Sequence, residues 1–385
     1  MQTYARQPVA FVRGEGVWLY DESGDKYLDA VAGVAVSGLG HGHPVLAKAL
    51  CEQAATLIHT SNLYRIPKQE QLADRLCMLS GLDKAFFCNS GAEANEAAIK
   101  LARLHGHNRG IDNPAIVVME KSFHGRTLAT LSATGNRKVQ AGFEPLVGGF
   151  VRVPFGDADA VAKLAEHHNN IVAVLVEPYQ GEGGVQIPEA GYLDKLRAIC
   201  DANEWLLMLD EVQTGIGRTG KWFAFQHSNS LPDVMTLAKG LGSGVPVGAC
   251  LARGVAAEVF TYGKHGSTFG GNPFACTAAL ATLDVMAADH LPGNAVEIGN
   301  FIMDTLRKEL GSVPGVKEIR GQGLIIGVEL DRPCGDLVKM ALAEKLLINV
   351  TSDNVVRLIP PLVMNREEAA LLTDKLTALI WAFLN

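Results

Sequence analysis

Two residues of opposite charge, each placed after a run of apolar residues, could do chemistry together. The apolar run 206–209 leads into Asp210, and the run 234–238 leads into Lys239. Such runs predict buried parallel strands, which deliver the residues that follow them to one edge of the sheet. A lysine for a Schiff base and a carboxylate facing a pyridinium nitrogen are the pair that pyridoxal 5'-phosphate (PLP) chemistry needs. Taken alone, the pair is weak evidence for PLP chemistry, because an Asp that caps a strand and a Lys in a surface loop give the same pattern.

A turn of small residues before an alanine-rich segment offers a place for a phosphate. Ser90, Gly91 and Ala92 open the segment that continues as EANEAAIKLA. The start of a helix has free N–H groups and the positive end of the helix dipole, and small side chains let an anion approach the backbone. An ordinary Asn/Ser helix cap is the competing interpretation.

An aromatic ring and an arginine follow the apolar run 115–119, in the motif Ser-Phe-His-Gly-Arg-Thr. The face of Phe123 could stack on a flat cofactor ring. The guanidinium of Arg126 could bind a substrate carboxylate through two hydrogen bonds. A core Phe and a surface Arg are the plain alternatives.

A glycine-rich stretch at residues 266–273 carries two hydroxyl groups. Ser267 and Thr268 could reach a phosphate, and the surrounding glycines would let the backbone come close to a ligand. A simple glycine-rich turn would have the same composition.

Six motifs taken together resemble the class III PLP-dependent aminotransferases. In chain order they are NSGAEANEAAIKLAR, SFHGRT, VEPYQGEGG, LDEVQTGIGRTG, LAKGLGSGVPVGA and GSTFGGNP. The resemblance extends from Gly14 to the stretch VVRLIPPL near the end of the chain. It implies the fold type I of PLP-dependent transferases and a transaminase activity with PLP as cofactor.

The resemblance also implies roles for individual residues. Lys239 matches the Schiff-base lysine, Asp210 the partner of the pyridine nitrogen, and Gln213 a residue beside the phenolic oxygen of the ring. Phe123 would stack on the ring, and Ser90, Gly91 and Ala92 would bind the phosphate. Thr268 matches a threonine that reaches the phosphate from the neighbouring subunit, which implies a homodimer with shared active sites. Ser267 and Arg126 match positions that contact substrate.

Two kinds of substrate pose an electrostatic problem for such a site. An acylated ornithine reacts at its terminal amine and has its carboxylate far from the reacting carbon, whereas glutamate has one carboxylate near and one far. We therefore predict Arg126 as the far cationic site and Arg357 as the near one. A buried arginine without a partner is costly, so Glu182 is predicted to pair with Arg357 and to swing away when glutamate binds.

The segment before the Gly-His-Gly-His-Pro motif bears on the choice of amine donor. Ornithine-specific members of the class carry an aromatic residue there, but residues 32–44 contain no Tyr or Phe. A small apolar lining at Val34 would leave the charged α-amine of ornithine unpaired. This favours N-acetylornithine as donor and 2-oxoglutarate as acceptor, as in arginine biosynthesis. N-succinylornithine, succinyldiaminopimelate, ornithine or 4-aminobutyrate as donor stay open, as do a PLP decarboxylase and an aminomutase.

Composition narrows the class of protein further. The net charge is −7 with no basic block, which disfavours nucleic acid and anionic membranes as partners. Seven scattered cysteines without a C-x-x-C pair argue against a disulfide or zinc framework, and no metal is expected at His41 and His43. No apolar signal segment or membrane span is evident, so we expect a cytoplasmic location.

Alternating helix and strand patterns predict an α/β fold in two domains. A large PLP-binding domain over residues 46–273 would hold a mainly parallel seven-stranded sheet flanked by helices. Residues 274–385 would form a smaller α+β domain, with helices near 275–289, 337–344 and 366–383. Residues 1–45 would join it through short strands near 11–13 and 17–20. Chemistry placed after strands suits the carboxyl ends of an open sheet.

Overall fold

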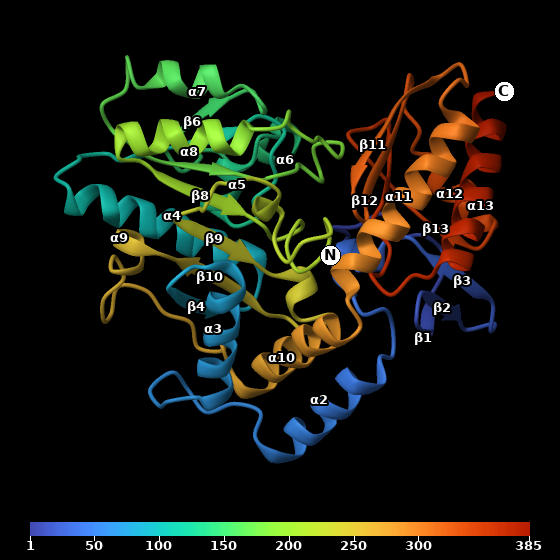
Figure 1. Cartoon of the computed structure of the whole chain (residues 1–385), viewed down its shortest axis with the longest axis horizontal. Coiled ribbons are helices and arrows are strands. Elements are labelled where there is room, and N and C mark those ends of the chain that lie inside the picture. The colour runs from blue at the N-terminus through green and yellow to red at the C-terminus, as the bar shows by residue number, and fades with distance from the viewer.

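The computed structural model describes all residues 1–385, and its largest element is a seven-stranded sheet (Figure 1). Its spatial order is β4 (Lys84–Cys88), β10 (Gly248–Ala252), β9 (Val234–Leu237), β8 (Leu206–Asp210), β7 (Ile171–Val176), β5 (Ala115–Met119) and β6 (Phe150–Val153). Only β10 runs antiparallel to its neighbours. The predicted α/β class and mainly parallel seven-stranded sheet are therefore confirmed.

Helices cover both faces of this sheet, because its strands are apolar on both sides. In β5, Val117 and Met119 belong to one core cluster, while Ile116 and Val118 belong to another. The first cluster includes residues of α3 (Pro67–Ser80), α7 (Ala158–Leu164), α8 (Tyr192–Asn203) and α10 (Pro273–Ala288). The second includes residues of α4 (Gly91–Asn108) and α9 (Gly254–Ala257). Side chains that alternate along each strand thus hold the two helical layers.

The C-terminal part of the chain builds a second sheet, in the order β11 (Val316–Gln322), β12 (Ile325–Leu330), β15 (Val355–Leu358) and β14 (Asn349–Thr351). The helices beside it are α11 (Leu291–Leu310), α12 (Leu337–Ala343) and α13 (Arg366–Leu384). Figure 1 shows this red and orange part at one side of the large sheet.

The N-terminal strands lie with this C-terminal part. A third sheet has the order β1 (Phe11–Glu15), β2 (Trp18–Asp21), β3 (Lys26–Asp29) and β13 (Leu346–Leu347), so β13 joins the two ends of the chain. Figure 1 shows the blue strands beneath the red helices. The remaining helices are α1 (Ala32–Ala35), α2 (Pro44–Thr56), α5 (Leu128–Ala133) and α6 (Arg137–Gln140). The exact domain boundaries stay a prediction.

Helix α11 was not predicted, because its sequence opens Leu-Pro-Gly and contains a second glycine, Gly299. Proline is tolerated in the first turn of a helix, where its missing N–H costs nothing. Gly299 lies against the backbone of Gly323, where a Cβ atom would collide with the carbonyl oxygen. The glycine is there for close packing and does not mark a loop.

We asked whether any helix is long and apolar enough to span a membrane. No single helix is long and apolar enough to cross a bilayer, while α10 and α11, bent by 65° at their junction, pass such a test as a pair. Most apolar residues of both helices are buried in the protein core.

Candidate active site

A cavity of about 410 Å³ lies where β8 and β9 end and α4 begins. This volume is within the range of cofactor and small-molecule sites. Nine of the predicted site residues line it: Ser90, Gly91, Ala92, Phe123, Arg126, Glu182, Asp210, Gln213 and Lys239. The structure thus brings together segments that are up to 149 residues apart in the chain, from Ser90 to Lys239.

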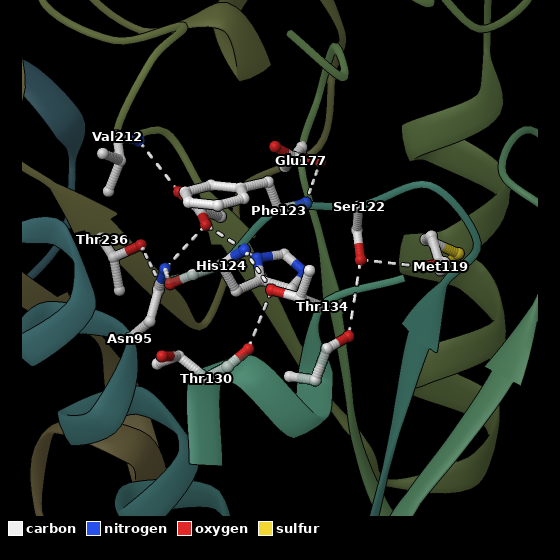
Figure 2. A network of polar contacts seen from close by, with 12 residues as sticks. Asn95, Met119, Ser122, Phe123, His124, Thr130, Thr134, Glu177, Val212 and Thr236 are labelled. Carbon is white, nitrogen blue, oxygen red and sulfur yellow. Dashed lines mark hydrogen bonds and ion pairs between the residues drawn. The ribbon is translucent and has the colours of Figure 1, made fainter. Parts of the chain in front are cut away.

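Asp210 is fixed at the bottom of the cavity by three hydrogen bonds. Its Oδ2 accepts from Asn95 Nδ2 at 2.7 Å and contacts His124 Nδ1 at 2.8 Å, while its Oδ1 accepts from the backbone N–H of Val212 at 3.0 Å. Thr236 Oγ1 donates in turn to Asn95 Oδ1 at 2.7 Å. Figure 2 shows Asn95, His124, Val212 and Thr236 in this network, with Phe123 close to it. Such a network holds a buried carboxylate in one orientation.

Lys239 reaches the same cavity by a strained turn directly after β9. In the register of β8 and β9, Asp210 pairs with Thr236, three residues before Lys239. Lys239 has φ +42°, a left-handed conformation that a lysine seldom adopts without support from its surroundings. Burial lowers the pKa of its amine, and the nearby Arg357 adds to this, while Glu182 and Asp210 act in the opposite direction. A lysine with a lowered pKa is suited to act as a base near neutral pH.

The first turn of α4 forms the end of the cavity that suits a phosphate. Ser90 caps this 18-residue helix, with its hydroxyl accepting from the backbone N–H of Glu93 at 3.2 Å. Gly91 faces Val212, and a Cβ atom at Gly91 would lie 2.7 Å from Val212 Cγ1. The glycine is therefore required for the helix to start this close to β8.

Phe123 and Arg126 occupy one wall of the cavity. The backbone N–H of Phe123 donates to Glu177 Oε2 at 3.3 Å, which fixes the start of this loop. The guanidinium of Arg126 lies 5.7 Å from the centroid of the Phe123 ring, within reach of a cation–π interaction. Arg126 is exposed toward the cavity mouth, so a carboxylate can approach it from solvent.

Glu182, at the other wall, forms an ion pair with Arg357, as predicted, although Arg357 itself does not line the cavity. Arg357 Nη1 donates to Glu182 Oε1 at 2.8 Å and to Gln213 Oε1 at 3.3 Å. The side chain of Arg357 is 1% exposed, whereas that of Glu182 is 37% exposed. Burial raises the pKa of Glu182, but the charge and hydrogen bond of Arg357 outweigh this and hold it below its usual range.

Val34 is not among the lining residues, so this detail of the prediction is wrong. The residue of that segment that lines the cavity is Val36. Ala32, Gly33, Val34 and Ala35 all have φ between +51° and +67°, and this left-handed turn shifts the inward-facing position by two residues. The lining is still small and apolar, as the argument about the donor requires.

Ser267 and Thr268 do not line the cavity of their own chain. Ser267 Oγ accepts from Asn89 Nδ2 at 3.3 Å, and Asn89 does line it. Thr268 is exposed on the outside of the molecule. Neither residue lines the cavity of the single chain, so the roles predicted for them stay predictions.

Four polar residues of the site were not predicted from the sequence: Asn95, His124, Glu177 and Thr236. Glu177 is buried at the cavity, and burial together with the nearby Asp210 raises its pKa well above the usual range. The signal available in the sequence was the buried carboxylate itself, since a buried Asp must have hydrogen-bond partners. The sequence did not indicate which residues would supply them.

The arrangement fits PLP at each of its parts. The cavity combines a lysine of lowered pKa, a fixed buried carboxylate, an aromatic face and a helix N-terminus. Lys239 would bind the aldehyde carbon of PLP, and Asp210 would face the nitrogen of its ring. Phe123 would lie against the PLP ring, and Ser90–Ala92 would bind its phosphate.

Comparison with known proteins agrees with this geometry. Residues 2–380 match the family model "Aminotransferase class-III". An acetylornithine aminotransferase of Nitrosomonas europaea is 65% identical over 384 residues, which cover 100% of this chain and 98% of that protein. Among solved structures, the ornithine aminotransferase of Toxoplasma gondii ME49 has a TM-score of 0.96 at 35% identity, covering 100% of this chain and 92% of that one. The acetylornithine aminotransferase of Elizabethkingia anophelis has a TM-score of 0.89 at 35% identity, covering 99% and 96%. The chain belongs to the class III aminotransferases, and its cofactor is PLP.

Proposed function

We propose that this enzyme transfers the terminal amine of N-acetylornithine to 2-oxoglutarate, giving N-acetylglutamate 5-semialdehyde and glutamate, a step of arginine biosynthesis. The observation that carries the proposal is the ion pair between the buried Arg357 and Glu182, which lines the cavity together with Lys239. The name of the 65% identical relative supports the same donor.

In the proposed reaction, Lys239 and Asp210 act on the transfer of one proton from the reacting carbon of the substrate. PLP, when bound, supplies a protonated ring that accepts electrons from the substrate carbon. Lys239 would accept the proton from that carbon, because its lowered pKa leaves the amine free to take up a proton. Asp210 would favour a protonated ring nitrogen, and its contacts with Asn95 and His124 hold its carboxylate in place.

Two arginines can account for the two substrates. Arg126 binds the distant carboxylate of either substrate, since it lies in the open part of the cavity. Arg357 binds the near carboxylate of glutamate or 2-oxoglutarate after Glu182 has swung toward solvent. When N-acetylornithine binds, no near carboxylate arrives, and Glu182 stays on Arg357 to neutralise it.

The lining of the cavity favours a donor whose α-amine is acylated over one whose α-amine is free. The segment before the Gly-His-Gly-His-Pro motif contributes only the apolar Val36. A free α-amine, as in ornithine, would add a positive charge beside Arg126 without an aromatic or anionic partner from this segment. Acetylation removes that charge.

Subunit association is a further part of the proposal. Asn62 of the loop 57–66 donates hydrogen bonds to the loop 261–271, and so does Gln69 at the start of α3. The two loops expose large apolar side chains, namely Leu57, Ile58, Leu63, Tyr64, Tyr262 and Phe269. Several exposed large apolar side chains on two joined loops suit a subunit interface. A homodimer formed here would explain how Thr268 could reach a neighbouring active site, and sedimentation analysis at several concentrations tests it.

A half-reaction titration tests the proposed reaction. The PLP-loaded enzyme is mixed with N-acetylornithine, N-succinylornithine, succinyldiaminopimelate, ornithine or 4-aminobutyrate, and the cofactor absorbance is followed. We expect the fastest conversion to pyridoxamine phosphate with N-acetylornithine, and reversal by 2-oxoglutarate. Faster conversion with another donor would reassign the substrate, and no conversion with any of them would overturn the proposal.

A further inference from the structure

Two buried arginines of the smaller part lie in one row across its sheet. In the pairing of β11 with β12, Arg320 is opposite Gly327, and in the pairing of β12 with β15, Gly327 is opposite Arg357. Residues directly paired across strands project from the same face. Arg320 and Arg357 therefore flank a glycine on one face of this sheet.

The segment of residues 181–186, here called the Glu182 loop, lies on this row. Arg320 Nε donates to the carbonyl oxygen of Val185 at 2.8 Å, and its Nη2 donates to that of Gly184 at 2.6 Å. Arg357 holds the Glu182 carboxylate at 2.8 Å. A Cβ atom at Gly327 would lie 2.9 Å from Val185 Cβ, so the glycine makes room for the loop.

Other contacts tie the same loop to the smaller part. The hydroxyls of Thr351 and Ser352 both donate to the carbonyl oxygen of Glu182. Val185 is fully buried at φ +51°, a conformation that a β-branched residue keeps only when its surroundings enforce it. It packs in a cluster that includes Ile325, Val355 and Ile359. The loop follows a strand of the large sheet but is held by the smaller one.

Two glutamates that do not belong to the Glu182 loop balance the charge of Arg320. Its Nη1 donates to Glu318 Oε2 at 2.6 Å and to Glu329 Oε2 at 2.7 Å. These bonds fix the guanidinium and leave Nε and Nη2 directed at the two carbonyls of the loop.

We propose that Arg320 is a positioning residue that anchors the backbone of the Glu182 loop to the β11–β12–β15 sheet, so that only the Glu182 side chain moves between substrates. The anchor sets how well Glu182 neutralises Arg357, and through this it sets the selectivity between donors without a near carboxylate and glutamate. The inference rests on the proposed function for its substrates, but not for the anchoring itself.

The test compares Arg320→Lys with Glu318→Gln as a matched control. A lysine ammonium is a single point charge and cannot span both carbonyls as the guanidinium fork does. Glu318 contacts Arg320 but not the loop, and its side chain is 60% exposed. In the control, Glu329 keeps its charged bond to Arg320 Nη1 and the new amide oxygen can still accept from it, so the guanidinium stays in place. We expect Arg320→Lys to lower the ratio of kcat/KM for N-acetylornithine to kcat/KM for glutamate by about 10-fold, mostly through KM for N-acetylornithine. In Glu318→Gln the ratio should stay within about 2-fold of the unmodified enzyme.

Hydrogen–deuterium exchange of the amides of residues 181–186 gives a readout independent of activity. We expect faster exchange in Arg320→Lys than in the unmodified enzyme and the control. Gly327→Ala, whose methyl group would push on Val185, is expected to produce both effects without removing a charge.

Each failure has its own signature. Unchanged exchange in Arg320→Lys and Gly327→Ala would overturn the anchoring, and faster exchange with an unchanged substrate ratio would overturn its link to selectivity. Failure of the proposed function would instead appear as no turnover of N-acetylornithine by the unmodified enzyme.

Discussion

The two ends of the active-site cavity hold their carboxylates in different ways. At the cofactor end, defined by Asp210, Asn95, His124 and Lys239, the Asp210 side chain is 4% exposed and hydrogen-bonded on both oxygens. At the gate end, defined by Glu182, Arg357 and Gln213, the Glu182 side chain is 37% exposed and its carboxylate is held by one arginine.

The difference indicates which end can move. Removing Asp210 from its site would break three hydrogen bonds in a buried network, and each unsatisfied partner would cost about 1–3 kcal/mol. Glu182 can exchange its single partner for water, provided that another carboxylate takes its place on Arg357. A fixed end suits a cofactor that never leaves its orientation, and a movable end suits two substrates of different charge.

The largest expected effect is that of Lys239→Ala at the cofactor end. Without the amine the cavity loses its base of lowered pKa, and kcat should fall by about 10³-fold or more. Steady-state kinetics at saturating donor measure the change, and a thermal melt shows whether the fold is kept. A kcat within tenfold of the unmodified enzyme would mean that another group is the base.

Asp210→Asn is expected to have the next largest effect. The amide has the same shape but no charge to keep the ring nitrogen protonated, so kcat should fall by about 10²–10³-fold. The matched control is Glu211→Gln, because Glu211 is adjacent in the chain but does not line the cavity. Similar losses of kcat in the two variants would contradict the role given to Asp210.

Glu182→Ala tests the gate end directly. Arg357 would then be buried without its carboxylate, so kcat/KM for N-acetylornithine should fall by about 10-fold relative to that for glutamate, which brings its own carboxylate. Competition between the two donors in one reaction mixture gives the ratio. If the ratio is unchanged, the gate does not act as described.

The smallest expected effect is on the pH dependence of folding stability, and it comes from a buried carboxyl group outside the active site. Glu211 is buried, and burial raises its pKa to about 7, although Thr214 and the backbone N–H groups of Ala224 and Phe225 donate to it. A carboxyl whose pKa is raised by folding stabilises the folded state below its unfolded pKa, and this contribution is lost as the pH rises through about 7.

The unmodified enzyme should therefore lose stability relative to Glu211→Gln between about pH 4.5 and pH 7, by at most about 1.4 kcal/mol per pH unit, with little further change above pH 7. Chemical unfolding of both proteins at these pH values measures the difference. A difference that does not change with pH would show that Glu211 does not titrate in this range.

The sequence contained the local pattern of the site, but not all of its contacts. Lys239 and Asp210 were predictable, because each follows an apolar strand and parallel strands end at one edge. The pairing of Glu182 with Arg357 was predictable from charge, since a buried arginine needs a partner. The contact of Gln213 with Arg357 and the bonds from Asn95 and His124 to Asp210 depend on side-chain packing between distant segments. The position of Val36 depends on a left-handed turn in which three of the four residues are not glycine, which local propensity disfavours.

A crystal structure of the enzyme with PLP and α-methylglutamate tests the contrast between the two ends most directly. This analogue carries both carboxylates but has no α-hydrogen to lose. We predict that its near carboxylate binds Arg357 and that Glu182 is displaced from its present 2.8 Å contact, while Asp210 keeps its bonds to Asn95 and His124. An intact Glu182–Arg357 pair with the analogue bound, or an Asp210 that has moved, would contradict the account.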